Sequence, residues 1–231
     1  MGNTFVLKKN IAIIIAIVLH SVGLAGILFF KSDLIIRCTP ITLLLCFVLL
    51  LWTQRKITAA FIFFVIIVCA GGFFIEVAGV KTGWLFGKYT YGKVLGPRVL
   101  DVPVIIGVNW FIVTYCCGIT GRLFIERMER ANMISINRRV FLLPVAGAAI
   151  AALFDWLMEP VAIMLGFWQW ENNEVPLYNY FCWFIASMIF LSGFEKRDFD
   201  KQNKFAPVLL LIQSLFFLIL GFCLVYFNNT G

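Results

Sequence analysis

Seven long apolar segments, separated by short polar loops, constrain the fold of this chain more than any other feature of its sequence. A helix that crosses a bilayer needs about 20 apolar residues. The apolar segments lie at residues 10–30, 34–53, 58–80, 102–123, 140–165, 177–194 and 206–227. Only 13% of the 231 residues are charged, whereas a soluble domain carries about a quarter charged residues. The sequence therefore predicts an all-α integral membrane protein, a single polytopic domain over residues 1–231 with a bundle of about seven transmembrane helices.

The basic residues indicate how this bundle is oriented. The N-terminus and alternate loops hold 13 Lys and Arg residues, and the opposite side holds 6. By the positive-inside rule, we expect a multi-pass protein of the cell membrane with its N-terminus in the cytoplasm and its C-terminus outside. Because this topology accounts for the net charge of +7, we expect no nucleic-acid partner. Segment 10–30 is interpreted as a retained first helix rather than a signal peptide, since no A-x-A-like cleavage site follows it.

Two helical hairpins, residues 58–123 and 140–194, contain the same motifs in the same order. In each, an acidic residue is followed by an aromatic-x-aromatic motif and then by Val-Pro, with a tryptophan seven residues after the proline. The first series is Glu76, Tyr89-Thr90-Tyr91, Val102-Pro103 and Trp110, and the second is Glu159, Trp168-Gln169-Trp170, Val175-Pro176 and Trp183. The pattern predicts a parallel internal repeat about an axis near the membrane normal. The aromatic loops fit either a belt at the headgroup level or a rim over a lipid-accessible pocket.

Three acidic residues, Glu76, Asp155 and Glu159, fall within the predicted membrane spans. A charge at the bilayer centre costs about 2.5 to 3.5 kcal/mol on insertion scales, so such residues usually face the bundle interior and have a function there. Asp155 and Glu159 are four residues apart and therefore project from one face of their helix. Two neighbouring carboxylates in a low dielectric cannot both ionise cheaply, so this pair is expected to provide a general acid beside a general base.

Further polar and aromatic residues are expected at the same level, in the outer half of the membrane. They are Asn109, Trp110, Tyr178, Asn179 and Trp183, and we expect the two asparagines and the two tryptophans to bind substrate next to the acids. A purely structural alternative stays open, in which the acids pair with Lys81, with Arg98 or with the asparagines as buried polar contacts between helices.

The residue inventory limits the chemistry that such a chamber could perform. One histidine and no cluster of thiolates predict no metal site. The absence of G-x-G-x-x-G, Walker and G-x-S-x-G motifs gives nucleotide and serine-hydrolase chemistry no support, and no cofactor is expected. Carboxylic acids and aromatic rings instead suit acid-initiated chemistry on an isoprenoid alkene, in which ring faces stabilise the carbocation. The ionised partner then activates water or removes a proton, so hydration and cyclisation both stay open.

Residues 70–184 resemble a known family in the order of their motifs. The resemblance lies in FIEVAGVKTG at 74–83, FGKYTYG at 86–92, Val102-Pro103 with Asn109-Trp110, DWLMEPVA at 155–162, FWQW at 167–170, and Val175-Pro176 with Asn179 and Trp183. These segments are similar to the carotenoid biosynthesis family of membrane-bound carotenoid 1,2-hydratases (CruF type), which is related to the membrane lycopene cyclase domains.

This resemblance implies a reaction and a set of site residues. The implied reaction is addition of water to the terminal 1,2 double bond of an acyclic carotenoid end group, through a tertiary carbocation, by a hydro-lyase without a cofactor. Glu76, Asp155 and Glu159 are the implied acid and base candidates. Asn109 and Asn179 would position polar groups, and Tyr89, Tyr91, Trp168 and Trp170 would line or cover the pocket. The implied partners are a membrane-embedded carotenoid, the lipid bilayer and other enzymes of the carotenoid pathway.

Two other functions are compatible with the same residues. A lycopene-cyclase-like enzyme would use them for ring closure of the same substrates. A transporter or scaffold for a lipophile would also place acids and a parallel repeat within the membrane.

Overall fold

The computed structural model describes residues 2–229, without the side chains of residues 2, 3, 136–138 and 226–229. The helices are α1 (Gly2–Leu28), α2 (Asp33–Arg37), α3 (Thr39–Thr53), α4 (Ala59–Thr82), α5 (Ile105–Arg130), α6 (Ile136–Met164), α7 (Leu177–Lys196) and α8 (Ala206–Asn229). The strands described are β1 (Tyr89–Tyr91), β2 (Arg98–Val99), β3 (Val102–Pro103) and β4 (Trp168–Trp170), and a 3-10 turn at Glu171–Asn173 follows β4. The predicted all-α membrane bundle is confirmed.

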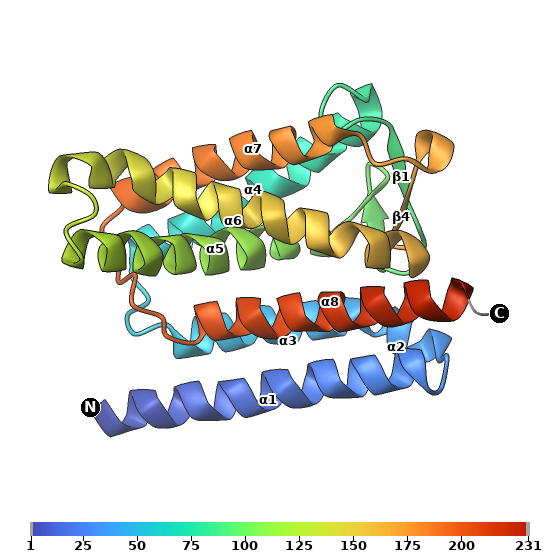
Figure 1. The fold of residues 1–231 in the computed structure, drawn as a ribbon, viewed down its shortest axis with the longest axis horizontal. Helices are drawn as coiled ribbons and strands as arrows, with labels where there is room; N and C mark the ends of the chain where they lie inside the picture. Colours follow the sequence, from blue (N-terminus) through green and yellow to red (C-terminus); the bar gives the residue numbers. More distant parts are fainter. Residues whose placement is uncertain (1, 230–231) are drawn as a thin grey trace.

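Within the described residues, six helices are long and apolar enough to cross a membrane. They are α1, α4, α5, α6, α7 and α8. The expected span at 34–53 is not one of these six, because it is broken into two helices, α2 and α3. Ser32 caps α2 by accepting a hydrogen bond from the Ile35 N–H, and α3 has Pro40 in its first turn. The 15 residues of α3 extend about 22 Å at 1.5 Å per residue. The chain termini lie at opposite ends of the bundle (Figure 1), while the predicted cytoplasmic position of the N-terminus stays a prediction.

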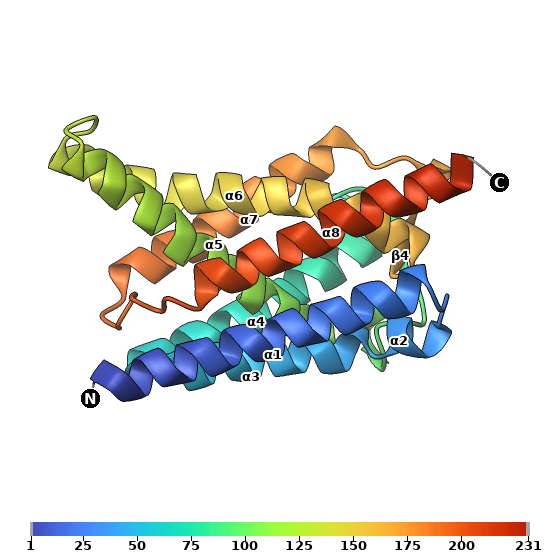
Figure 2. The ribbon, with the colours of Figure 1, turned by 60° about the horizontal axis from the view of Figure 1, so that its bottom comes forward.

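Helix α5 lies at the centre of the bundle. It is the most deeply buried of the long helices and packs against α3, α4, α6, α7 and α8. Figure 1 shows α4 to α7 together on one side and α8, α3 and α1 on the other, and Figure 2 shows α1 running along α3. Small residues let α5 and α6 approach closely, since a Cβ on Gly121 would lie 2.6 Å from the Gly147 nitrogen.

The apolar pattern predicts a loop at 122–139, between the expected spans 102–123 and 140–165. Helices α5 and α6 instead extend into this segment, to Arg130 and from Ile136. Ion pairs stabilise the extension at the end of the bundle where the N-terminus lies. Arg122 contacts Glu126 at 2.9 Å and Glu195 at 2.8 Å, and Arg139 contacts Glu126 at 2.8 Å and Glu129 at 3.1 Å. These contacts join α5, α6 and α7 outside the apolar part of the helices.

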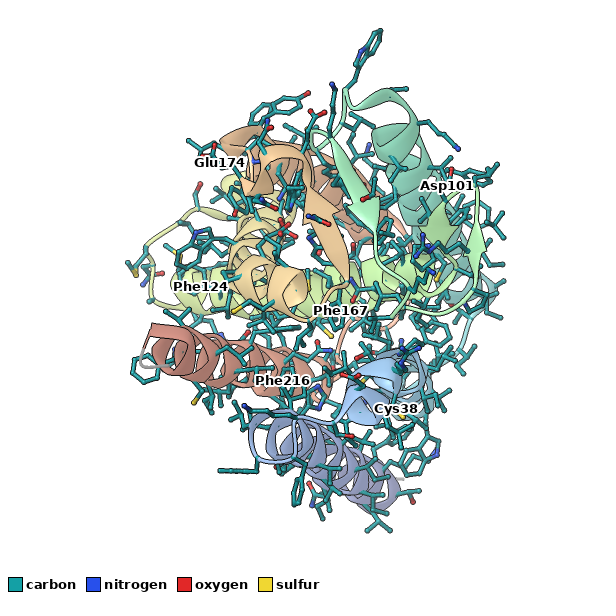
Figure 3. The ribbon with its side chains drawn as sticks, turned by 90° about the vertical axis from the view of Figure 1, so that its right-hand side faces the viewer. Cys38, Asp101, Phe124, Phe167, Glu174 and Phe216 are labelled. Atoms are coloured by element: carbon teal, nitrogen blue, oxygen red, sulfur yellow. The ribbon has the colours of Figure 1, made fainter. Side chains whose placement is uncertain are left out.

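At the opposite end, the two aromatic-x-aromatic motifs pair with each other as strands β1 and β4. The pairing is antiparallel, with Tyr89 opposite Trp170 and Tyr91 opposite Trp168. The contact between the two loops continues beyond the strands, because the Gly92 N–H donates to the Phe167 carbonyl at 2.8 Å. Figure 3 looks onto this end, where Asp101 and Glu174 mark the two loops on either side of the strands. The division into repeats 58–123 and 140–194 stays a prediction, but corresponding motifs of the two hairpins meet here.

Candidate active site

The eleven residues singled out in the sequence surround one small cavity beneath the β1–β4 strands. Its lining consists of Glu76, Tyr89, Tyr91, Asn109, Trp110, Asp155, Glu159, Trp168, Trp170, Asn179 and Trp183, together with Phe86, Ile106 and Met158. The cavity volume is about 20 Å³, which is room for about one water molecule. Residues up to 107 positions apart in the chain, from Glu76 to Trp183, thus meet at one place.

Glu76, from α4, is held by three hydrogen bonds from the first hairpin. The Tyr89 hydroxyl and the Tyr91 hydroxyl both donate to Oε2, the latter at 2.7 Å, and the Trp110 indole N–H donates to Oε1 at 2.9 Å. Glu76 as a whole residue is 4% exposed. Every partner is a donor, so the arrangement stabilises the ionised carboxylate, and both of its oxygens are engaged.

The two tyrosines of β1 are suited to this role because they stay protonated. Burial raises the pKa of Tyr89 and of Tyr91, and the neighbouring Glu76 carboxylate raises both pKa values further. Neutral phenols are hydrogen-bond donors, so a raised pKa keeps each hydroxyl available to donate to Glu76.

The second hairpin holds Glu159 in a related way. The indole N–H groups of Trp168 and Trp170 donate to Glu159 Oε2 at 2.9 and 3.0 Å. Strand β4 therefore anchors Glu159 of α6 as β1 anchors Glu76 of α4. The side chains differ, since two indoles replace two phenols.

Asp155 makes the second acid site different from the first. It lies one turn before Glu159 in α6, and Asn179 of α7 donates to Asp155 Oδ2 at 2.7 Å and to Glu159 Oε1 at 3.5 Å. The other oxygen, Asp155 Oδ1, is buried and has no hydrogen-bond partner among the described residues. A carboxyl oxygen in this situation is best satisfied by carrying a proton, because burying an unpaired charge is far more costly than burying a neutral group.

Two tryptophans form the apolar floor of the cavity. The rings of Trp110 and Trp183 are stacked, with centroids 4.0 Å apart and planes inclined by 5°, and Phe86 lies 6.3 Å from each of them. Ring faces carry negative potential and attract cations within about 6 Å. The tryptophans occupy the same position in the two motif series, so the predicted repeat places like residues face to face.

The alternative in which the buried acids only pair with basic residues or asparagines agrees with the structure in part. Lys81 forms an ion pair with Asp101, an exposed loop residue whose pKa the lysine lowers, and contacts none of the three buried acids. Asn179 does pair with Asp155 and Glu159, as that alternative expects. Asn109 lines the cavity without a hydrogen bond to a carboxyl group in the described part of the chain.

Sequence reasoning missed three lining residues, Phe86, Ile106 and Met158. Met158 could have been found because it directly precedes Glu159, and Ile106 because it lies three residues after Pro103, as Asn179 does after Pro176. Across residues 2–229, no group of three or more His, Cys, Asp or Glu side chains is arranged to hold a metal ion. The expectation of a site without a metal or cofactor stays a prediction.

Comparisons with known proteins identify the family of this chain. Residues 38–230 match the family described as "Carotenoid biosynthesis protein". The chain is 28% identical over 163 residues to the bisanhydrobacterioruberin hydratase of Haloarcula japonica, covering 67% of this chain and 53% of that protein. The chain thus spans about half the length of this relative. No solved structure matches this chain. Because the family match covers most of the chain, this multi-pass membrane protein belongs to the carotenoid biosynthesis protein family.

Proposed function

We propose that this chain is a carotenoid hydratase that adds water across the terminal 1,2 double bond of an acyclic carotenoid end group. The observation that carries the proposal is the buried pair Asp155 and Glu159, which lines an aromatic cavity and in which Asp155 Oδ1 has no hydrogen-bond partner among the described residues. Family membership supports carotenoid chemistry, and the name of the Haloarcula japonica relative supports hydration.

In this proposal Asp155 is the proton donor. Its Oδ1 carries a proton, since the Asn179 amide occupies Oδ2 as a donor. Transfer of that proton to C2 of the substrate breaks the π bond and leaves a tertiary cation at C1. The faces of Trp110 and Trp183 stabilise this cation through their quadrupoles. General acid catalysis of this kind contributes about 10²- to 10⁴-fold to a rate.

Glu159 is the proposed general base. A water molecule attacks C1 as its proton passes to Glu159, which forms the C–O bond of a tertiary 1-hydroxy group and leaves no net charge on the product. One proton has then left Asp155 and one has reached Glu159. A return of the proton between these two carboxyl groups restores the starting state, so the cycle consumes only water.

Glu76 acts in a different way. It has no second carboxyl group one turn before it in its helix, and two of its three donors come from β1. Glu76 therefore serves to position β1, and β1 in turn positions β4 and the two indoles that hold Glu159. We therefore assign Asp155 and Glu159 as catalytic residues and Glu76 as a positioning residue.

Expression in a lycopene-accumulating host tests this function, with pigments analysed by chromatography and mass spectrometry. The expected result is a product one water heavier than lycopene, lost in Asp155→Asn and Glu159→Gln. Glu174→Gln is the matched control, because Glu174 is an exposed acid in the loop between β4 and α7 and does not line the cavity.

Two results would overturn the proposal. A ring-closed product with the mass of lycopene would identify a cyclase. No new pigment, with the protein present in the membrane and a monocyclic substrate also supplied, would favour a transporter or scaffold.

A further inference from the structure

A second, larger hollow lies directly behind Glu159, on the outside of the bundle. It is a groove of about 690 Å³ between α6 and α8, bounded at one end by the start of α7. Its walls are mostly apolar and include Trp156, Pro160, Leu218, Gly221 and Val225. Trp156, Leu218 and Val225 are exposed on helices that span the membrane, so the groove opens toward lipid.

Glu159 lines both this groove and the small cavity. This residue therefore lies between a 690 Å³ apolar space and a 20 Å³ space that contains the acid pair. An acidic residue beside a lipid-facing groove is costly, and such residues are retained in membranes where they act on something. An ordinary lipid chain lying in the groove would gain nothing from this group.

A glycine on α8 helps to keep the groove open. Gly221 has no side chain, and a Cβ built there would meet only the Val161 Cγ2 atom, at an ordinary contact distance of 3.4 Å. Glycine is thus not needed at this position for a close approach of helices. Its effect is to leave space between α6 and α8.

We infer that this α6–α8 groove binds the polyene chain of the carotenoid substrate and delivers its end group to Asp155. The inference rests on the proposed function. A cavity with room for one water molecule cannot hold an isoprenoid end group, so the group must enter from an adjoining space. The groove adjoins it at a residue of the acid pair. Displacement of the Glu159 side chain joins the two spaces, while the rest of the long apolar chain remains in the groove and the surrounding lipid.

Two leucines of α8 offer a matched test. Leu218 lines the groove and is 55% exposed, while Leu211, two turns earlier, is 58% exposed and lies outside the groove. Leu218→Trp is expected to fill the groove. Purified protein with this change, incubated with lycopene in detergent micelles, should retain about tenfold less lycopene on gel filtration than the wild type. Leu211→Trp should retain the wild-type amount.

A second variant and a kinetic measurement separate binding from chemistry. Gly221→Leu should reduce lycopene retention as Leu218→Trp does, and both should raise KM by about tenfold with kcat little changed. Thermal unfolding of each variant in detergent, compared with Leu211→Trp, shows that the protein is folded.

The lycopene retention assay does not depend on hydration, so the two proposals fail in different ways. If Leu218→Trp and Leu211→Trp retain equal amounts of lycopene, the inference that the groove binds the polyene chain is wrong, whether or not the wild type hydrates lycopene. If only Leu218→Trp loses lycopene retention and the wild type gives no hydrated product, binding of the carotenoid in the groove is supported and the proposed hydratase activity is wrong.

Discussion

The two hairpins place corresponding glutamates, Glu76 and Glu159, in the same cavity, but the surroundings of the two glutamates differ. Glu76 and Glu159 each receive three hydrogen bonds, but Gly72 lies one turn before Glu76 and Asp155 lies one turn before Glu159. What distinguishes the second site is Asp155, whose Oδ1 has no hydrogen-bond partner among the described residues. In the proposed function, one framework thus supports the fold in one half and carries the reaction in the other.

Packing explains why the first hairpin has no second acid. A Cβ on Gly72 would lie 2.3 Å from Cγ of Trp110, so no side chain fits there. In the second hairpin, Asp155 fits and finds Asn179 as its donor. The residue corresponding to Asn179 in the first hairpin is Ile106, which cannot donate a side-chain hydrogen bond.

The largest expected effect separates the two acid sites by activity. In purified protein, Asp155→Asn should lower the hydration rate by about 10²- to 10⁴-fold, since an amide cannot supply the proton. Glu76→Gln should lower it less than tenfold. Initial rates of product formation measure both. Equal losses in the two variants would remove the proposed division of roles.

The second prediction concerns stability, for which Glu76→Gln is expected to have a larger effect than Asp155→Asn. Glu76→Gln turns one acceptor into an amide that faces hydrogen-bond donors, so it should lower the free energy of unfolding by about 1–3 kcal/mol. Asp155→Asn should cost less, because Oδ1 has no donor to lose. Thermal unfolding in detergent gives the comparison. Greater destabilisation by Asp155→Asn would show that Asp155, rather than Glu76, supports the fold.

The third prediction tests the packing at Gly72. Gly72→Ala should displace Trp110 and cost about 1–3 kcal/mol of stability through overpacking. Gly193→Ala in α7 is the control, since a Cβ there meets nothing within 4 Å. It should be neutral or stabilising by about 0.5–1 kcal/mol, the difference in helix propensity between the two residues. Similar unfolding temperatures for the two variants would contradict the explanation from packing.

The smallest expected effect compares residues that lie opposite each other in the β1–β4 pair. Tyr91→Phe removes a donor to Glu76, and Trp168→Phe removes a donor to Glu159. Each lost hydrogen bond should cost about 1 kcal/mol of stability. Only Trp168→Phe should also change the pH dependence of the hydration rate, because Glu159 is the proposed base. A changed pH profile in Tyr91→Phe would assign Glu76 to the chemistry.

Some features of the fold were within reach of the sequence and still missed. Ser32 before Asp33, and Pro40 just inside a helix start, are local signals for two helix beginnings in the segment expected to be one span. The extension of α5 and α6 past their apolar segments depends on Arg122 and Arg139 finding acids on neighbouring helices. That second feature is tertiary, so hydrophobicity alone could not predict it.

The sequence by itself determined the helical membrane bundle, the presence of acids within it and the order of the motifs in the two hairpins. These follow from the length of apolar segments and from local spacing, which short-range physics sets. Only the tertiary structure decided that β1 pairs with β4, that Trp110 stacks on Trp183, and that Glu76 is fully hydrogen-bonded while Asp155 is not. The reason is that each of these depends on side chains distant in the chain meeting within hydrogen-bond or ring-contact distance. Their positions are set by how whole helices pack.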